Sequence, residues 1–566
     1  MIASPACLPA VAVRNHVLLP CLSAVRRWAA LRVATSRPGQ DEAVAGDGAL
    51  PPLPRWAWPL CWAVVAVAVG LLVRLPGPDA LDPDEHASVL YFDRLVAGER
   101  LEEPLLSAPK PLLTVVHGLA WHAGHDWRLL AAVTVAAFAL TVICLARAAG
   151  RLGGPAAAAA VLLAVAGSGP LVLQAARGNS VIFAMAGWSV ALDALTRGTR
   201  PSGEGPAWAV AAAALALAGL ARAETWLLLP VAAGWGLLVW WRGRGAPRPQ
   251  PPGRPGLGPG GGDRRAVLLV LPLAVPLLWL GHDWLLTGDP LYSLQVPERY
   301  TDLLAGRQVI PPGDWLALVA RRYAPDPLLL ALAAVGVTWL VWRRAWVWLG
   351  FLAATGVGVL ALLGLEAWRG TYISWRYFDP ADLAVRLAAA LGAAALANGL
   401  AGRLAGRMGR VGLTAAVAAL TAVLLVGAAT TPPAPFDPQV DSTLDRGARL
   451  SANTATAIAV LAPLAARPGS VITVSGPQRT RVAVELDLPL GRVRDLFLAT
   501  RATPLDRALA GSDAVFHDAD GDQPVKRFAP LSTTTPTRVG EVGLIPLRTD
   551  PGRGLYVHRI EGPGGR

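Results

Sequence analysis

Apolar runs of 16 to 21 residues alternate with short polar breaks from about residue 58 to residue 428. A helix of about 20 apolar residues crosses the hydrocarbon core of a bilayer. The runs lie at 58–73, 128–146, 154–173, 179–195, 206–221, 225–241, 266–284, 326–342, 345–365, 381–400 and 411–428. This pattern predicts a polytopic all-α membrane protein with about 11 transmembrane helices.

One further apolar run, Pro111–Trp121, is only 11 residues long and is too short to cross a membrane. Counting it as a span would also invert the side on which every later Arg-rich turn lies. We therefore expect it to form an interfacial or re-entrant helix on the outer face.

Arginine marks every second break between the spans, and the Pro/Gly/Arg-rich linker 242–265 adds six more. Positively charged loops tend to stay in the cytoplasm. The linker and the N-terminus are therefore predicted to be cytoplasmic, in a multi-pass protein of the plasma membrane. Residues 1–55 are predicted to be a disordered cytoplasmic tail, and the segments 74–127 and 287–325 to be outer loops.

Polarity rises after Thr430, where the transmembrane domain, 56–429, is predicted to end. Strand-like runs at Val471–Ser475, Asp513–His517 and Gly554–Ile560 accompany a helical run at 451–466. Residues 430–566 are therefore predicted to form a small extracytoplasmic α/β domain.

Composition agrees with a membrane protein, since 54% of the residues are hydrophobic and 16% are charged. The net charge of +12 lies mostly in the hydrophobic part, because residues 430–566 hold 16 Lys and Arg against 14 Asp and Glu. Arginine there marks the ends of spans, so no nucleic-acid partner is predicted. All four cysteines precede residue 150, which excludes a disulfide-based scaffold.

The first outer loop carries the ordered motif Asp84-Glu85-His86, then a run ending at Gly98, then Lys110-Pro111-Leu112-Leu113. In this order the motif resembles the GT-C superfamily of polyprenyl-phosphate-sugar-dependent membrane glycosyltransferases, which includes protein O-mannosyltransferases and lipid A aminoarabinose transferases. Leu112 stands where a second Pro is common in that superfamily. The resemblance covers residues 58–150.

The resemblance implies that Asp84 is the general base and that Glu85 orients the acceptor or binds a metal. Transfer of a sugar from a lipid phosphate needs a base for the acceptor proton, and the phosphate leaves as a stabilised anion. In the alternative interpretation, these carboxylates belong to a solvated loop or cap the following helix.

Lys110 corresponds in the same way to a lysine that contacts the lipid phosphate, although it could equally anchor the chain at the interface. Further candidates for substrate binding are Arg222, Arg376, Tyr377 and His86. A structural pair of Arg222 with Glu224 is the alternative for that arginine.

The histidines at 86, 117, 122 and 125 fit no standard metal-binding spacing. No cofactor is therefore predicted with certainty, and a divalent metal is left open. The outer loop 287–325, which contains Tyr292, has the length of a functional loop that covers an acceptor.

The sequence thus predicts a glycosyltransferase that moves a sugar from a polyprenyl-phosphate donor to a glycan, lipid or protein acceptor of the cell envelope. The alternatives are a transporter or flippase of a lipid-linked substrate and a noncatalytic envelope-assembly protein. A transporter would place ionisable residues in the middle of its spans, whereas the charges here lie mostly at the ends of spans.

Overall fold

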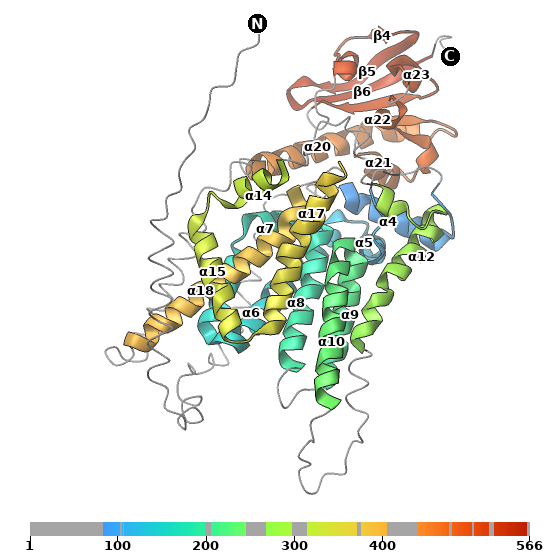
Figure 1. Cartoon of the computed structure of the whole chain (residues 1–566). Helices are drawn as coiled ribbons and strands as arrows, with labels where there is room; N and C mark the ends of the chain where they lie inside the picture. Colours follow the sequence, from blue (N-terminus) through green and yellow to red (C-terminus); the bar gives the residue numbers. More distant parts are fainter. Residues whose placement is uncertain are drawn as a thin grey trace, which may run out of the picture. The chain divides into compact units, whose positions relative to one another are not determined.

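The computed structural model describes most of the chain after residue 82 (Figure 1). The described residues are 83–101, 105, 107–198, 205–244, 268–296, 314–370, 375–404, 439–474, 478–500, 503–519 and 526–562. All of these belong to one compact unit of the chain, 53–566. The predicted spans at 58–73 and 411–428 and the predicted tail 1–55 lie outside the described residues.

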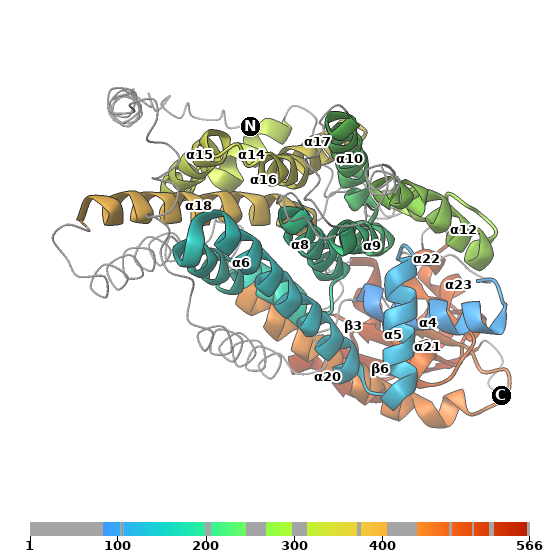
Figure 2. The same ribbon diagram turned by 90° about the horizontal axis from the view of Figure 1, so that it is seen from below.

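Helices account for every described element before residue 404. They are α4 (Pro83–Ala97), α5 (Pro111–Gly124), α6 (Trp127–Ala166), α7 (Gly169–Ala176), α8 (Ser180–Gly198), α9 (Gly205–Ala221), η2 (Ala223–Leu227), α10 (Leu228–Arg244), η3 (Leu271–Ala274), α12 (Val275–Thr287), α14 (Trp315–Tyr323), α15 (Pro327–Trp342), α16 (Trp346–Leu352), η5 (Ala353–Gly358), α17 (Val359–Trp368), η6 (Trp375–Phe378) and α18 (Asp379–Leu404). Helix α8 packs between α6 and α9 (Figures 1 and 2).

Five helices among the described residues are long and apolar enough to cross a membrane, and the number rises to seven if each of two bent pairs counts as one span. Nine of the predicted apolar runs correspond to helical segments of the structure. The helical, multi-pass character predicted from the sequence is therefore confirmed, while the total of 11 spans stays a prediction. Helix α5 has 14 residues, or about 21 Å, which is too short to span.

The predicted break between the runs 128–146 and 154–173 is a kink inside α6 rather than a loop. Gly154 there has φ 74° and ψ −166°, a conformation that glycine adopts without steric cost. Pro155 follows, and it cannot continue the hydrogen bonds of the preceding helical turn. Two helices consequently meet without a connecting loop.

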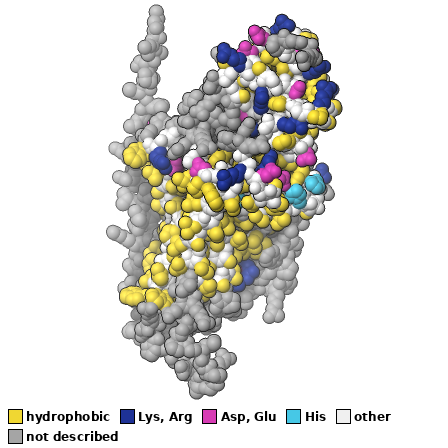
Figure 3. Space-filling view, turned by 90° about the vertical axis from the view of Figure 1, so that its right-hand side faces the viewer, with side chains coloured by type: hydrophobic (Ala, Val, Ile, Leu, Met, Phe, Trp, Pro, Cys, Tyr) yellow, Lys and Arg dark blue, Asp and Glu magenta, His cyan; other side chains and the backbone are white. Residues whose placement is uncertain are grey.

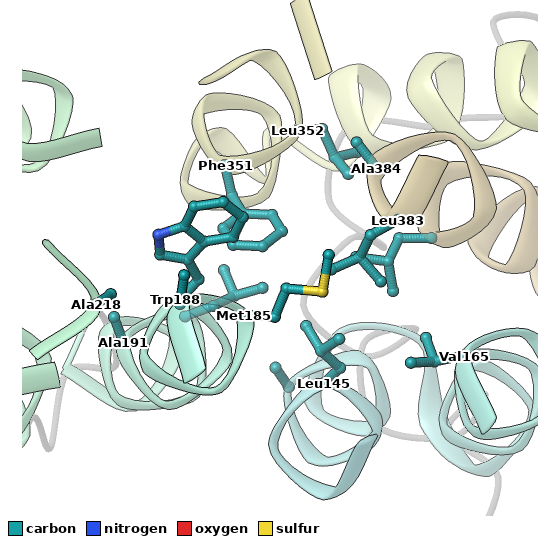
Figure 4. Packing of buried hydrophobic residues seen from close by; sticks show 14 of the residues in the cluster. Leu145, Val165, Met185, Trp188, Ala191, Ala218, Phe351, Leu352, Leu383 and Ala384 are labelled. Carbon is teal, nitrogen blue, oxygen red and sulfur yellow. The ribbon is translucent and has the colours of Figure 1, made fainter. Parts of the chain in front are cut away.

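The core of the bundle is built from small and medium apolar side chains. Leu145 of α6, Met185 and Trp188 of α8, Phe351 of α16 and Leu383 of α18 meet in its interior (Figure 4). Because lipid is as apolar as these side chains, close packing rather than exclusion of water holds such helices together.

The backbones of helices α15 and α18 approach each other especially closely. A Cβ atom on Gly336 would lie 1.9 Å from the carbonyl oxygen of Ala388, and one on Gly392 would lie 2.0 Å from that of Leu332. Only glycine allows the two backbones to come so near.

Large apolar side chains cover the outside of the helical part. Leu277, Leu278 and Leu285 of α12 and Val357 of η5 are more than half exposed. Hydrophobic side chains dominate the helical part of the face in Figure 3, and charged side chains gather above them. Such an exposed apolar surface fits a lipid environment.

The C-terminal segment 439–562 contains a six-stranded mixed sheet. Its elements are α20 (Gln439–Ala465), β1 (Ile472–Val474), α21 (Arg479–Glu485), η8 (Leu490–Arg492), β2 (Val493–Asp495), α22 (Leu496–Ala499), α23 (Leu505–Leu509), β3 (Ala514–Asp518), η9 (Lys526–Leu531), β4 (Thr537–Val539), β5 (Val542–Asp550), η10 (Pro551–Arg553) and β6 (Leu555–Glu561). The strand order is β2-β1-β3-β6-β5-β4. Strand β1 pairs in parallel with β2 and β3, and the remaining pairs are antiparallel. The three predicted strands and the predicted helix are present, whereas the boundary of a separate domain stays a prediction.

Helix α4 shares a hydrophobic core with this C-terminal segment. Ala87, Leu90 and Tyr91 of α4 belong to the same buried cluster as Leu461 of α20 and Phe516 of β3. The indole N–H of Trp127 also donates a hydrogen bond of 2.9 Å to Glu485 of α21. The start of the first described helix is therefore held by residues that come almost 400 positions later.

Candidate functional site

Asp84 and Glu85 lie in the first turn of α4, which begins at Pro83. Proline is favoured in a first helical turn, where its missing N–H has no partner within the helix. The backbone of Asp84 is helical, and its side chain lies outside the described residues. Its role as the base stays a prediction.

Glu85 points into the protein, where its side chain is fully buried. Its Oε2 lies 2.6 Å from Nδ1 of His117, which is fully buried as well and belongs to α5. The edge of the His117 ring faces Phe183 of α8 at 5.6 Å between centroids. The pair thus fastens the start of α4 to the middle of α5, and a role of Glu85 toward an acceptor or a metal stays a prediction.

His86 is 6% exposed and meets Trp127 edge-on, with the ring centroids 4.5 Å apart. Burial holds the pKa of His86 well below its ordinary value, and the positive charge of Arg481 and the neighbouring His117 lower the pKa further. His86 is therefore neutral at pH 7. Nothing in the structure tests its predicted contact with a substrate.

The described residues contain no group of three or more His, Cys, Asp or Glu side chains that could hold a metal ion. His122 instead pairs with Asp93 of α4 at 2.7 Å on the surface. The structure of these residues accordingly gives no argument for a metal, and the question stays open.

Lys110 stands immediately before α5, in an extended conformation with Pro111 as the first helical residue. The segment leading to it is tightly held. The hydroxyl of Tyr292 donates to the carbonyl of Leu105 and accepts from its N–H, both at 2.7 Å. The hydroxyl of Ser293 lies within hydrogen-bond distance of Pro109 O, at 3.1 Å. Tyr292 is buried and anchors the Lys110 segment, and the predicted role of the loop 287–325 as an acceptor cover stays a prediction.

Arg222 is buried and has polar or aromatic neighbours on three sides. Its Nε and Nη2 donate to the two oxygens of Glu224 at 3.1 and 2.5 Å, and its Nη1 donates to Ser180 at 3.2 Å. The Cζ atom of the guanidinium lies over the Tyr377 ring, 5.3 Å from its centroid. The structural pair that was the alternative for Arg222 is thus present.

Glu224 also interacts electrostatically with Lys110. Two of the residues proposed from the sequence to bind a substrate, Lys110 and Arg222, therefore interact with the same carboxylate, and a third, Tyr377, lies against Arg222. Arg376 belongs to the same short helix as Tyr377, η6, but its side chain lies outside the described residues.

Tyr377 is held in place through its neighbour Phe378, which is fully buried against Leu318 and Leu363. Arg322 covers the Phe378 ring at 4.9 Å and pairs with Asp382 of α18. This packing fixes the direction in which η6 presents Tyr377.

The sequence alone gave no signal for two residues that contact or influence the candidate site, Ser180 and Arg481. Ser180 is the first residue of α8 and looks like an ordinary helix start. Arg481 acts on His86 from α21. A separation of almost 400 residues from the Asp84-Glu85 motif leaves no local pattern that could connect Arg481 with it.

No protein-family model matches the sequence, and no curated protein matches it significantly. Several solved structures do match this chain. The ArnT of Cupriavidus metallidurans bound to undecaprenyl phosphate is 12% identical, and the match covers 89% of this chain and 98% of ArnT with a TM-score of 0.51. The same ArnT in the apo state gives 14% identity and a TM-score of 0.48, with 88% and 97% covered.

The oligosaccharyltransferase of Archaeoglobus fulgidus tethered with an acceptor peptide is 11% identical. That match covers 82% of this chain and 69% of the oligosaccharyltransferase, with a TM-score of 0.48. The chain therefore has the fold of ArnT over most of its length, in agreement with the resemblance that the motifs around Asp84 and Lys110 indicate.

Proposed function

We propose that this protein is a membrane glycosyltransferase that takes a sugar from a polyprenyl-phosphate donor and attaches it to a cell-envelope acceptor on the outer face of the plasma membrane. The observation that carries the proposal is that Arg222, which lies over the Tyr377 ring, pairs with Glu224, a carboxylate that also interacts electrostatically with Lys110 at the N-terminus of α5. Two cations and a helix N-terminus form a favourable environment for a phosphate group.

The fold supports the lipid part of the proposal. ArnT, which has this fold, has been seen with undecaprenyl phosphate bound. The exposed apolar surface of α12 would leave a lipid tail in contact with other apolar groups.

In the proposed reaction the bond between the sugar C1 and the phosphate oxygen breaks, and a bond from C1 to an acceptor oxygen forms. The electron pair of the broken bond leaves with the phosphate, whose charge Lys110 and Arg222 stabilise. Asp84 takes the proton of the acceptor. The buried contact of Glu85 with His117 holds the helical turn that carries Asp84.

The test begins with a deletion strain, whose envelope glycans and lipids are compared with the parent by mass spectrometry. We expect loss of one sugar modification, its return with the wild-type chain, and no return with Asp84→Asn at equal membrane abundance. Loss of a general base typically lowers the rate about 10²- to 10⁴-fold.

Asp93→Asn is a matched control, since Asp93 is a partly exposed carboxylate of the same helix and pairs with His122 on the surface. It should restore the modification. Normal restoration by Asp84→Asn would refute the proposed base. Loss of the modification in the deletion strain together with accumulation of the lipid-linked sugar on the inner leaflet would favour a flippase.

A further inference from the structure

Glu224 occupies the edge of Arg222 that a phosphate would use. The bidentate contact at Nε and Nη2 is the geometry in which a guanidinium binds either a carboxylate or a phosphate. The third contact, from Nη1 to Ser180, holds the arginine from the other side. An incoming phosphate therefore meets a cation that is already matched by one negative charge.

The charges at this place can be summed from three side chains. Lys110 and Arg222 contribute one positive charge each, and Glu224, which contacts Arg222 and interacts with Lys110, contributes one negative charge. The three together carry a single positive charge. Without Glu224 they would carry two.

The two lipids of the proposed reaction differ in charge. In the donor the phosphate is a diester and carries one negative charge. After the C1–O bond breaks, the remaining polyprenyl phosphate is a monoester, and such a group carries about −1.5 to −2 near pH 7. A site with two uncompensated cations would bind the product more strongly than the donor, and the product would then inhibit the enzyme.

We propose that Glu224 sets the charge selectivity of the site, matching it to the singly charged donor and promoting release of the doubly charged product. This inference rests on the proposed function. Glu224 is suited to the role because its side chain, at 23% exposed, is more accessible than that of Arg222, at 7% exposed.

The experiment compares two lipids that differ only in the phosphate charge. Undecaprenyl phosphate is the monoester, and its methyl ester is a diester without a sugar. Dissociation constants are measured at pH 8 for the purified full chain in detergent, by native mass spectrometry or thermophoresis. For the wild type we expect the monoester to bind no more than about tenfold more tightly than the diester, because a single net positive charge attracts the second negative charge of the monoester only modestly.

The informative variant is Glu224→Gln, which keeps an oxygen that can accept from Arg222 while removing the charge. Its affinity for the monoester should rise about tenfold more than its affinity for the diester, which corresponds to about 1.4 kcal/mol. Glu366→Gln is the matched control, since Glu366 is 30% exposed and pairs with Arg369 on α17. It should leave both constants unchanged.

An unchanged ratio in Glu224→Gln, or equal weakening of both lipids, would mean that Glu224 only holds Arg222 in place and would overturn the inference. If that variant does not fold, the ratio of the two dissociation constants in the wild type is the test. A monoester that binds more than about tenfold more tightly than the diester would contradict a site whose positive charge is partly neutralised by Glu224. A wild-type chain that binds neither lipid would refute the proposed function itself.

Discussion

The pair of Glu85 and His117 gives the sharpest test of how the candidate site is built. Both side chains are fully buried and 2.6 Å apart. Breaking a buried pair by removing one partner costs about 3–5 kcal/mol, because the remaining polar group is left without compensation. Glu85→Leu and His117→Leu should each lower the free energy of unfolding by about 3 kcal/mol.

The double variant separates this coupling from simple loss of volume. Replacing both partners of a buried pair by apolar residues is much less costly than removing one. Glu85→Leu/His117→Leu should therefore lose about 3 kcal/mol rather than the sum of about 6 kcal/mol. The measurement is unfolding of the purified protein in mixed micelles, followed by circular dichroism.

The pair of Asp93 with His122, which joins the same two helices on the surface, is a matched control. Asp93 and His122 also lie 2.7 Å apart, but their side chains are 38% and 48% exposed. Their coupling should stay below about 1 kcal/mol. Strictly additive losses of the free energy of unfolding for Glu85 and His117 would refute the view that this pair fastens α4 to α5. Normal sugar transfer by the double variant would show that the pair has no part in positioning Asp84.

Further predictions concern the donor, the helix packing, pH and topology. Lys110→Ala should raise KM for the lipid-linked donor and leave KM for the acceptor unchanged, whereas a lysine that merely anchors the chain would alter membrane yield and not the kinetics of folded enzyme. Gly336→Ala or Gly392→Ala should abolish folded yield in a detergent size-exclusion assay, because the added methyl would meet backbone at about 2 Å, while Gly399→Ala, with open space around it, should be tolerated. The pKa of His86 is lowered in the folded protein, so below about pH 6.5 the unfolded chain binds a proton that the folded protein does not. Stability should consequently fall as pH drops through about 6.5, and His86→Asn should flatten this slope in unfolding measurements between pH 7.5 and 5. A reporter active only outside the cytoplasm, fused at the C-terminus, should be active, and cytoplasmic reporting there would contradict the predicted parity of spans.

The positions of the helices along the chain were largely predictable, because lipid requires every backbone polar group to be paired within the protein. A run such as 381–400 must bury its backbone polar groups in a helix, whatever its neighbours are. The kink at Gly154 was visible only as a break in hydropathy, since the glycine's positive φ depends on the packing of both halves of α6.

The candidate site was predictable where its residues are near in sequence or carry a motif. The pair of Arg222 with Glu224 is two residues apart and was foreseen. The contact between Glu85 and His117 joins two elements whose relative position depends on tertiary packing. The electrostatic effect of Arg481 on His86 depends on the complete fold of the C-terminal segment, so no local pattern indicates it.

The shared core of α4 and the C-terminal segment has a consequence for synthesis of the protein. Ala87 and Leu90 pack against residues that the ribosome adds almost 400 positions later. At about 5–20 residues per second, α4 waits roughly 20–80 s for its partner α21. During that interval the side of α4 that carries Ala87 and Leu90 lacks its partners from the C-terminal segment, although α5 already follows it and can pack against the helix. The turn that carries Asp84 is therefore translated early and completed late, and a nascent chain that stops before α21 has the Asp84-Glu85 motif without the packing that supports α4 in the folded protein.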